Sequence, residues 1–318
     1  LLMQAPAAAL PDEILVPGEE RVRGLVCVSG DPLSSLPDSR RCQEALERLD
    51  FLVCLARREN ATTAHADWIL PVTHPWERSD LQLVDHHLLP RTLLRWTPPL
   101  VEAEGEARTE QEVLAELAAR LRPTRKGSGW GTHVHLLGRL VGRSSLEQWM
   151  RRAVEWSTEH EWTELETAPH RIDHGDTDRS EWQVSTPSDR IRLLPTEARE
   201  ALRDLAVPAR AEDYPLWLRT SLRVDTQACG QESRHGTPDP GLSIHPDFGI
   251  PDGARVRVST RHGMVETVAH HEPGLRTDCV DLPYGYGVDV MALLSAARLD
   301  ELCGTATLDG VPCRVEPC

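Results

Sequence analysis

Two polar stretches follow apolar runs of the chain, and both contain residue types that can bind a phosphorylated or nucleoside ligand. In the first, Val28–Pro32, Gly30 would let backbone approach a phosphate closely, and Asp31 could accept a hydrogen bond from a purine or ribose. In the second, Asn60 and Thr62 could hydrogen-bond a polar ligand. A Gly-Asp-Pro turn is more often plain chain punctuation than a ligand site, and the stretch with Asn60 and Thr62 could equally be the N-terminus of a helix.

A third stretch, Leu282–Gly287, has two glycines but not the GxGxxG spacing or the strand-to-helix context of a Rossmann fingerprint. Its Pro283, Tyr284 and Gly285 could bring backbone amides to a ligand. The same stretch could be a loop of a β-barrel. The sequence leaves both interpretations open.

The cysteines and histidines do not predict a metal centre. None of the eight cysteines belongs to a CxxC motif, and several lie in apolar runs, where a thiol behaves as a small hydrophobe. His160–Glu164 lacks the second histidine of HExxH, and there is no GxSxG elbow for a hydrolase. We therefore expect no zinc or iron–sulfur site in this chain and no catalytic constellation of its own.

The first two stretches depend on a predicted βαβ unit that would position them. Residues 22–28 and 51–55 are continuous apolar runs typical of strands in a parallel sheet. Between them, Asp38 is a suitable N-cap for a helix with apolar residues at i, i+3, i+4 and i+7. Because ligands bind at the carboxyl ends of such strands, both loops should face one crevice. Residues 68–71 predict a further short strand.

The middle of the chain predicts helices and loops. Thr109 and Glu112 match a capping box that opens a helix. The remaining predictions are a basic, Gly-rich boundary at 122–131, a helical region at 132–157, a polar loop at 167–182, a strand pair at 182–194 and a helix at 195–206.

The pattern changes from Tyr214 onward, where short alternating strands are separated by turns. The stretch 255–269 predicts a hairpin with Gly263 in its turn. Evenly spaced short strands of this kind favour a small barrel.

Composition excludes some partners. A net charge of −15 repels nucleic acid and anionic membrane surfaces, and no apolar run is long enough to span a bilayer. The chain opens without an initiator methionine or the features of a signal peptide. We therefore expect a cytoplasmic chain that begins partway through something larger.

The motifs together carry a family resemblance. The run LDFLVCLARRENATTAHADWILPVTHPWE resembles a segment of the molybdopterin oxidoreductases (the dimethyl sulfoxide reductase and formate dehydrogenase group), in which a strand is followed by a TETA..AD.vLP....E pattern. VSGDP falls where that family usually has a Gly-Asn-Pro turn. LSIHPDFGIPDGARVRVSTRHGMVETVA and LDELCGTATLDGVPCRVE are similar to parts of its molybdopterin-dinucleotide-binding domain.

The resemblance implies an α/β fold in which a partial parallel α/β (Rossmann-like) domain precedes a double-psi-type β-barrel domain. The α/β part would cover 1–130, a helical and loop connector 131–212, and the dinucleotide-binding barrel 213–318. It also implies molybdopterin guanine dinucleotide, with Mo or W, as cofactor. The family's [4Fe-4S] cluster and metal ligand would belong to an amino-terminal part that this sequence lacks.

The resemblance further implies which residues surround the cofactor. Asp67 and Glu77 would bracket a strand and loop beside the cofactor crevice and would not be a catalytic pair. Arg219 and Arg223 match basic positions at the start of the barrel domain. The full set of implied cofactor-binding residues is Gly30, Asp31, Pro32, Asn60, Thr62, Asp67, Arg219, Arg223, Pro283, Tyr284 and Gly285.

Two functions fit these expectations. The first is the carboxyl-terminal part of a molybdopterin-dependent oxidoreductase, inactive in isolation, whose partner is the rest of the oxidoreductase chain or an electron-transfer subunit. The second is a non-catalytic cofactor-binding or assembly module. A chain that retains only its cores is a third alternative. Asp31, where the family has asparagine, and Tyr284, where many relatives have histidine, depart from the family pattern.

Overall fold

The structure is a computed structural model, and it divides the chain into two compact units. Unit 1 joins Leu1–Ile69 to Leu193–Cys318, and unit 2 is Leu70–Arg192. The described residues are 5–81, 91–120, 146–157, 160–168, 171–176, 190, 193–203, 212–221, 240–297, 299–300 and 304–318. Within these residues, no helix has the length and apolar character needed to cross a membrane. The three-part domain division expected from the sequence remains a prediction.

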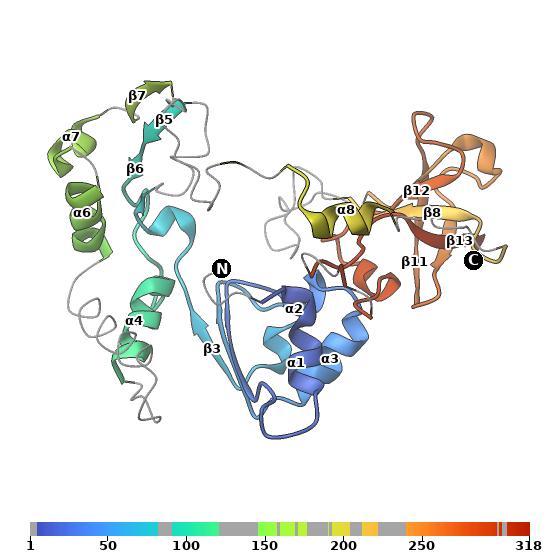
Figure 1. The fold of residues 1–318 in the computed structure, drawn as a ribbon, viewed down its shortest axis with the longest axis horizontal. Helices are drawn as coiled ribbons and strands as arrows, with labels where there is room; N and C mark the ends of the chain where they lie inside the picture. Colours follow the sequence, from blue (N-terminus) through green and yellow to red (C-terminus); the bar gives the residue numbers. More distant parts are fainter. Residues whose placement is uncertain are drawn as a thin grey trace. The chain divides into compact units, whose positions relative to one another are not determined.

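The amino-terminal part of unit 1 is built on a three-stranded sheet ordered β1-β2-β3, with short helices packed beside it (Figure 1). Strands β1 and β2 are parallel and pair Cys27 with Cys54, so the βαβ prediction is confirmed. The elements are η1 (Ala7–Ala9), α1 (Leu10–Leu15), β1 (Gly24–Val28), α2 (Pro32–Ser35), α3 (Ser39–Glu47), β2 (Phe51–Ala56), η2 (Thr63–His65) and β3 (Trp68–Pro71).

Helix α3 forms for the reasons its sequence suggested. The carboxylate of Asp38 accepts a hydrogen bond from the backbone N–H of Arg41, which satisfies one of the donors that every helix start leaves open. Its apolar stripe, Cys42 and Leu46, packs against the face of the sheet that carries Cys27 and Cys54. Local capping and burial of one stripe therefore both select this helix.

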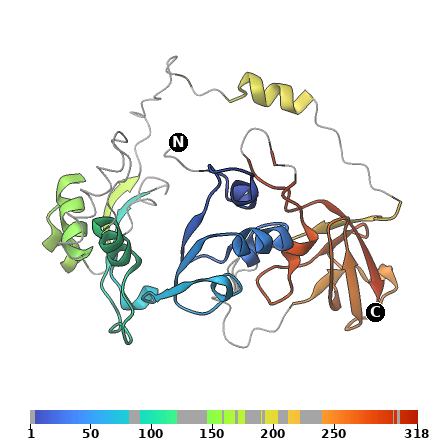
Figure 2. The ribbon, with the colours of Figure 1, turned by 90° about the horizontal axis from the view of Figure 1, so that it is seen from below.

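The carboxyl-terminal part of unit 1 is a closed six-stranded barrel, ordered β10-β11-β9-β12-β8-β13 (Figure 2). Alternation explains its core: in β10 the side chains of Val256 and Val258 are fully buried between exposed arginines. The predicted hairpin is confirmed as β10 paired with β11. The elements are β8 (Leu216–Arg219), β9 (Leu242–Ile244), η5 (Pro246–Phe248), β10 (Arg255–Ser259), β11 (Met264–His271), β12 (Cys279–Asp281), η6 (Val290–Leu293) and β13 (Val311–Pro317).

Helix α3 and the short helix η6 join the two parts of unit 1. The hydroxyl of Ser39 donates to Oδ2 of Asp289 at 2.7 Å, and the N–H of Asp38 donates to the carbonyl of Met291 at 3.0 Å. These residues are about 250 positions apart in sequence. The contact fixes the start of α3 to the barrel segment that follows Leu282–Gly287.

Unit 2 contains short strand pairs and helices around a small core. Trp162 and Val154 are buried there with Leu94. The capping box is confirmed, since Thr109 and Glu112 exchange hydrogen bonds between side chain and backbone. The elements are η3 (Pro75–Glu77), β4 (Asp80–Leu81), β5 (Arg91–Leu94), β6 (Trp96–Thr97), α4 (Glu110–Arg120), α6 (Leu146–Ser157), α7 (Trp162–Thr167) and β7 (Ile172–Asp176).

One prediction was wrong in unit 2. The polar stretch 167–182 was expected to be loop, but Ile172–Asp176 is strand β7, paired antiparallel with β5. Its acidic side chains point to arginine on β5 rather than to a core, so no apolar alternation marks the strand. The predicted helix near Pro195 is confirmed as α8 (Thr196–Arg203) in unit 1. The boundary at 122–131 and most of the strand pair at 182–194 lie outside the described residues.

Candidate functional site

The loops after β1 and β2 are tied together by Asp31 and Thr62. Oδ1 of Asp31 accepts from the Thr62 hydroxyl at 2.6 Å and from the Thr62 N–H at 3.1 Å. The Thr62 hydroxyl oxygen in turn accepts from the N–H of Leu33 at 3.1 Å. Asp31 is 3% exposed and Thr62 is 0% exposed. The two side chains therefore bind each other rather than project outward.

Asn60 and Gly30 extend the same contact. The Asn60 side-chain amide donates to the Gly30 carbonyl at 3.4 Å, and its oxygen accepts from the N–H of Thr63 at 2.8 Å. Pro32 begins α2 directly after Asp31. We call Gly30, Asp31, Asn60 and Thr62 the loop clasp. The structure thus brings these predicted residues together, and its hydrogen bonds fix the two loops to each other.

Asp67 lies at the opposite end of the sheet from the loop clasp. Its carboxylate accepts from the N–H of Leu52, the second residue of β2, at 2.7 Å. The clasp follows the last residues of the strand, where Ser29 donates to the carbonyl of Leu55. Three residues of strand separate the two places by roughly 10 Å. Asp67 therefore anchors the entry to β3 and does not join the other predicted residues.

Glu77 likewise makes a local bond. Its carboxylate accepts from the N–H of His74 at 2.7 Å, while the His74 ring accepts from the N–H of Trp76, which completes a capping box at η3. Both acids of the ADWILPVTHPWE stretch are thus bound to backbone N–H groups. This agrees with the expectation that they are not a catalytic pair.

A second set of predicted residues meets at one edge of the barrel. Strands β8 and β12 are parallel and pair Arg219 with Asp281, so both end at this edge. The segments that follow these two strands also lie side by side, since the N–H of Tyr284 donates to the carbonyl of Ser221 at 3.2 Å. We call Arg219, Ser221, Asp281 and the segment Pro283–Gly285 the barrel-end group. Arg223 lies outside the described residues.

The chemistry of the barrel-end group centres on the guanidinium of Arg219. Its side chain is 65% exposed, and its Nε lies 3.8 Å from Oδ1 of Asp281, beyond hydrogen-bonding distance. Asp281 is nearly buried and accepts from the hydroxyl of Ser221 at 3.0 Å. Gly285 has a φ of 93°, a conformation that favours glycine. An arginine fork in this setting can bind an oxyanion from solvent.

Sequence reasoning missed Asp281 and Ser221. Both flank predicted residues, but neither belongs to a motif. The available signal was the acid directly before Leu282–Gly287, next to a predicted strand. Its role became visible only from the pairing of β12 with β8.

The described residues contain no group of three or more His, Cys, Asp or Glu side chains close enough to hold a metal ion. Cys27, Cys42 and Cys54 share the core beneath the parallel sheet. Burial raises the pKa of Cys42 to about 12, so its thiol is neutral at physiological pH. These three cysteines act as packing groups.

The chain matches the family model "Molybdopterin oxidoreductase" over residues 5–120. It is 23% identical over 286 residues to acetylene hydratase of Syntrophotalea acetylenica, an alignment that covers 83% of this chain and 37% of that relative. It is 30% identical over 127 residues to dimethyl sulfoxide/trimethylamine N-oxide reductase of Cereibacter sphaeroides, covering 36% of this chain and 15% of that relative.

The fold is similar to the solved structure of acetylene hydratase from Pelobacter acetylenicus. The TM-score is 0.76 at 19% identity, and the match covers 99% of this chain and 47% of that one. The chain therefore spans less than half the length of these proteins, in sequence and in structure.

Proposed function

We propose that this chain is the carboxyl-terminal part of a molybdopterin-guanine-dinucleotide-dependent oxidoreductase. It carries a molybdopterin oxidoreductase domain and belongs to that family, which supports the proposal. In this proposal the metal ligand and the [4Fe-4S] cluster belong to an amino-terminal part of the enzyme. The cofactor, with Mo or W, supplies the redox chemistry when bound, and the protein supplies binding and orientation.

One observation carries the proposal: an exposed arginine fork stands where two parallel barrel strands end, beside a glycine-containing segment. Arg219 would bind the pyrophosphate, because a guanidinium can donate two parallel hydrogen bonds to phosphate oxygens. Asp281, close by and nearly buried, would hold the arginine in place. Tyr284 and Gly285 would line the adjoining backbone. These residues fit an anionic cofactor.

The loop clasp fits the cofactor less directly. The Asp31 carboxylate and the Thr62 hydroxyl are buried and hydrogen-bonded to each other. Their role in the proposal is to fix the loops so that exposed backbone beside them keeps one shape. The expectation that Asp31 itself accepts a hydrogen bond from the ligand has no support in this geometry.

The finer description of the fold belongs to the same proposal. The three-stranded sheet with parallel β1 and β2 would be part of a Rossmann-like domain. The barrel mixes parallel pairs, β9 with β11 and β8 with β12, with antiparallel ones, which supports a double-psi-type barrel. A cytoplasmic location remains a prediction.

The rest of the oxidoreductase chain is the partner that we propose for the open face of the parallel sheet. Val26 and Val28 of β1 lie on the face opposite α3, and Phe51 of β2 shares that face. These three side chains are 42–48% exposed. The β2 partners of the two valines, Val53 and Leu55, are buried, so the exposed part of this face lies over β1 and the start of β2. Parallel sheets are normally covered on both faces, so this face suits further protein. An electron-transfer subunit is the alternative partner.

A non-catalytic cofactor-binding or assembly module is the second candidate function. The hydrogen bond between Asp31 and Thr62 favours this second function, because two residues that were expected to bind ligand are bound to each other instead. The coding sequence upstream discriminates the two functions. A continuous CxxC-containing segment supports the enzyme, and a start codon at this position supports the module.

Nucleotide binding tests the role of Arg219. We would titrate guanosine 5′-diphosphate into the full chain by calorimetry and repeat the titration with Arg219→Gln. We expect saturable binding that the substitution weakens by about fivefold to tenfold, the range for a charge-assisted contact that is partly open to solvent. The matched control is Arg314→Gln, which removes another half-exposed barrel arginine.

The control should bind like the parent chain. Equal binding by the Arg219→Gln variant, or no binding by any of the three proteins, would remove the barrel-end group from the cofactor site. The better-supported function would then be a non-catalytic assembly module.

A further inference from the structure

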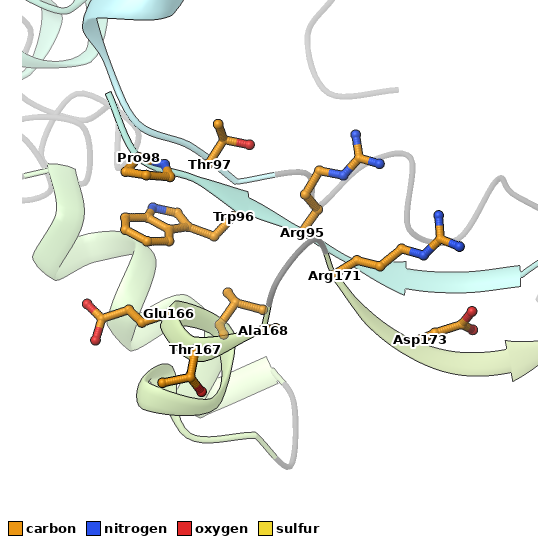
Figure 3. Close-up of a pocket in the computed structure, with 10 residues that line it drawn as sticks. Arg95, Trp96, Thr97, Pro98, Glu166, Thr167, Ala168, Arg171 and Asp173 are labelled. Carbon is orange, nitrogen blue, oxygen red and sulfur yellow. The ribbon is translucent and has the colours of Figure 1, made fainter. Parts of the chain in front are cut away.

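Unit 2 contains a pocket that none of the predicted cofactor residues lines. Its volume is about 950 Å³, within the range of small-molecule sites. Strand residues form one wall and helix α7 with the segment after it forms the other (Figure 3). The lining residues are Arg95, Trp96, Thr97, Pro98, Leu165, Glu166, Thr167, Ala168, Arg171 and Asp173.

Two arginines of this pocket face each other across a strand pair. Strand β5 pairs Leu94 with Ile172 of β7, so Arg95 and Arg171 occupy the next position of the same antiparallel register. Side chains at such positions start about 5 Å apart, and like charges placed there repel. In the view of Figure 3 both guanidinium groups extend in the same direction. The sequence thus places two positive charges together at the pocket.

Neither arginine has a hydrogen bond or ion pair to any described residue of the chain. The two carboxylates of the lining, by contrast, are already bound. Glu166 accepts from Arg151 at 2.8 Å and from the indole N–H of Trp162 at 2.8 Å. Arg95 therefore has no counter-charge among the described residues of the pocket wall, and Arg171 has only the nearby charge of Asp173, without an ion pair.

The second lining carboxylate, Asp173, is bound in the same way. It accepts from Arg91 at 3.1 Å and from the N–H of Gly175 at 2.9 Å. The hydrogen bond from the Gly175 N–H has the largest effect on the pKa of Asp173, and the bond from Arg91 the next largest; both lower it below its usual value. The Asp173 carboxylate therefore stays ionised and bound to these two groups. Arg91 also binds Asp176, whose side chain is 86% exposed to solvent.

The rest of the wall consists of two threonines, Thr97 and Thr167, and of apolar or aromatic residues. Trp96 packs edge-on against Trp162 with 5.2 Å between ring centroids, and Leu165 lies in the core beneath. The indole Nε1 of Trp96 is buried and has no acceptor among the described residues. In Figure 3, Ala168 lies next to Arg95, whereas Pro98 lies beyond Trp96, on the side away from the two guanidinium groups.

We propose that this pocket binds a small organic oxyanion, a carboxylate or phosphate on a flat apolar body, with Arg95 and Arg171 on the anionic group. An oxyanion between the two guanidinium groups removes their mutual repulsion and gives each a bidentate partner. The apolar body rests against Ala168, which lies next to Arg95. The inference goes beyond the proposed cofactor function and uses none of its residues.

Calorimetric titration of the full chain tests the site with four probes. Benzoate and phenyl phosphate carry an apolar body and an oxyanion, inorganic phosphate lacks the body, and benzamide lacks the charge. We expect saturable binding of benzoate or phenyl phosphate, weaker binding of inorganic phosphate and none of benzamide. The stronger of the first two identifies the oxyanion as carboxylate or phosphate.

Substitutions then locate the binding. Arg95→Gln and Arg171→Gln should each weaken binding by about fivefold, the upper range for an exposed charge contact. Arg152→Gln is the matched control, because Arg152 is an exposed arginine of unit 2 outside the pocket. Arg95→Lys and Arg171→Lys keep the charge but lose the fork, so an intermediate loss is expected even if a glutamine variant fails to fold.

Three results would overturn the proposal. The first is the absence of saturable binding of every oxyanion probe by the parent chain. The second is unchanged binding in the folded Arg95 and Arg171 variants. The third is an equal loss in Arg152→Gln.

Discussion

At the scale of single residues, burial decides what each cysteine can do. Cys42 and Cys313 are 1% and 0% exposed, and burial raises the pKa of each to about 12. At pH 8 only about one such thiol in ten thousand is the reactive thiolate. Cys318, at the end of the described chain, is exposed.

We therefore expect iodoacetamide at pH 8 to alkylate Cys318 rapidly and to leave Cys42 and Cys313 unmodified in the folded protein. Peptide mass spectrometry after timed labelling measures each site. In urea all three should react at similar rates, which controls for intrinsic differences between the peptides. Labelling of Cys42 at the rate of Cys318 without urea would show that its core opens.

At the scale of elements, the hairpin of the barrel depends on a close approach at its turn. A Cβ added to Gly263 would lie 2.3 Å from the carbonyl oxygen of Ala292 in η6, a distance that no real Cβ contact shows. Gly263→Ala should therefore push η6 away from the β10–β11 turn. We expect a loss of about 1–3 kcal/mol in the free energy of unfolding, typical of overpacking.

Urea unfolding followed by circular dichroism measures this loss. Gly24→Ala is the matched control, because its added Cβ would meet only the Phe51 carbonyl oxygen at 3.7 Å, an ordinary contact. The control should be neutral or slightly stabilising, since alanine restricts the unfolded chain. Equal stability of Gly263→Ala and the parent protein would mean that η6 adjusts without cost.

At the scale of the whole molecule, unit 1 is assembled from two distant parts of the chain. The hydroxyl of Ser39 and the carboxylate of Asp289 form one of the bonds that join them. Ser39 is 5% exposed, so its bond is protected from water. We expect Ser39→Ala and Asp289→Ala to be non-additive, with a coupling of about 1 kcal/mol in a double-mutant cycle.

Asp289 also caps η6, because its carboxylate accepts a hydrogen bond from the N–H of Ala292, and Asp289→Ala removes this bond as well. That loss occurs in both Asp289→Ala backgrounds and therefore cancels in the coupling term. Additive effects of the two substitutions on the free energy of unfolding would show that the bond does not join the two parts in solution.

The sequence by itself determined the elements whose causes are local. Asp38 caps α3 through a residue three positions away, and Thr109 and Glu112 close their capping box within one turn. The alternation of apolar and polar residues likewise predicted strand β10 of the hairpin, since Val256 and Val258 both lie on its one buried face. Each of these causes acts within a few residues, so the printed order of amino acids contains it.

Only the tertiary structure decided which polar groups meet and which stay open to solvent. Asp31 and Thr62 looked like ligand groups in sequence, but the register of β1 and β2 brings them together and buries both. Arg95 and Arg171 had no motif, and the pairing of β5 with β7 places them side by side. Such pairings follow from strand register, which depends on side chains far apart in the chain packing one common core.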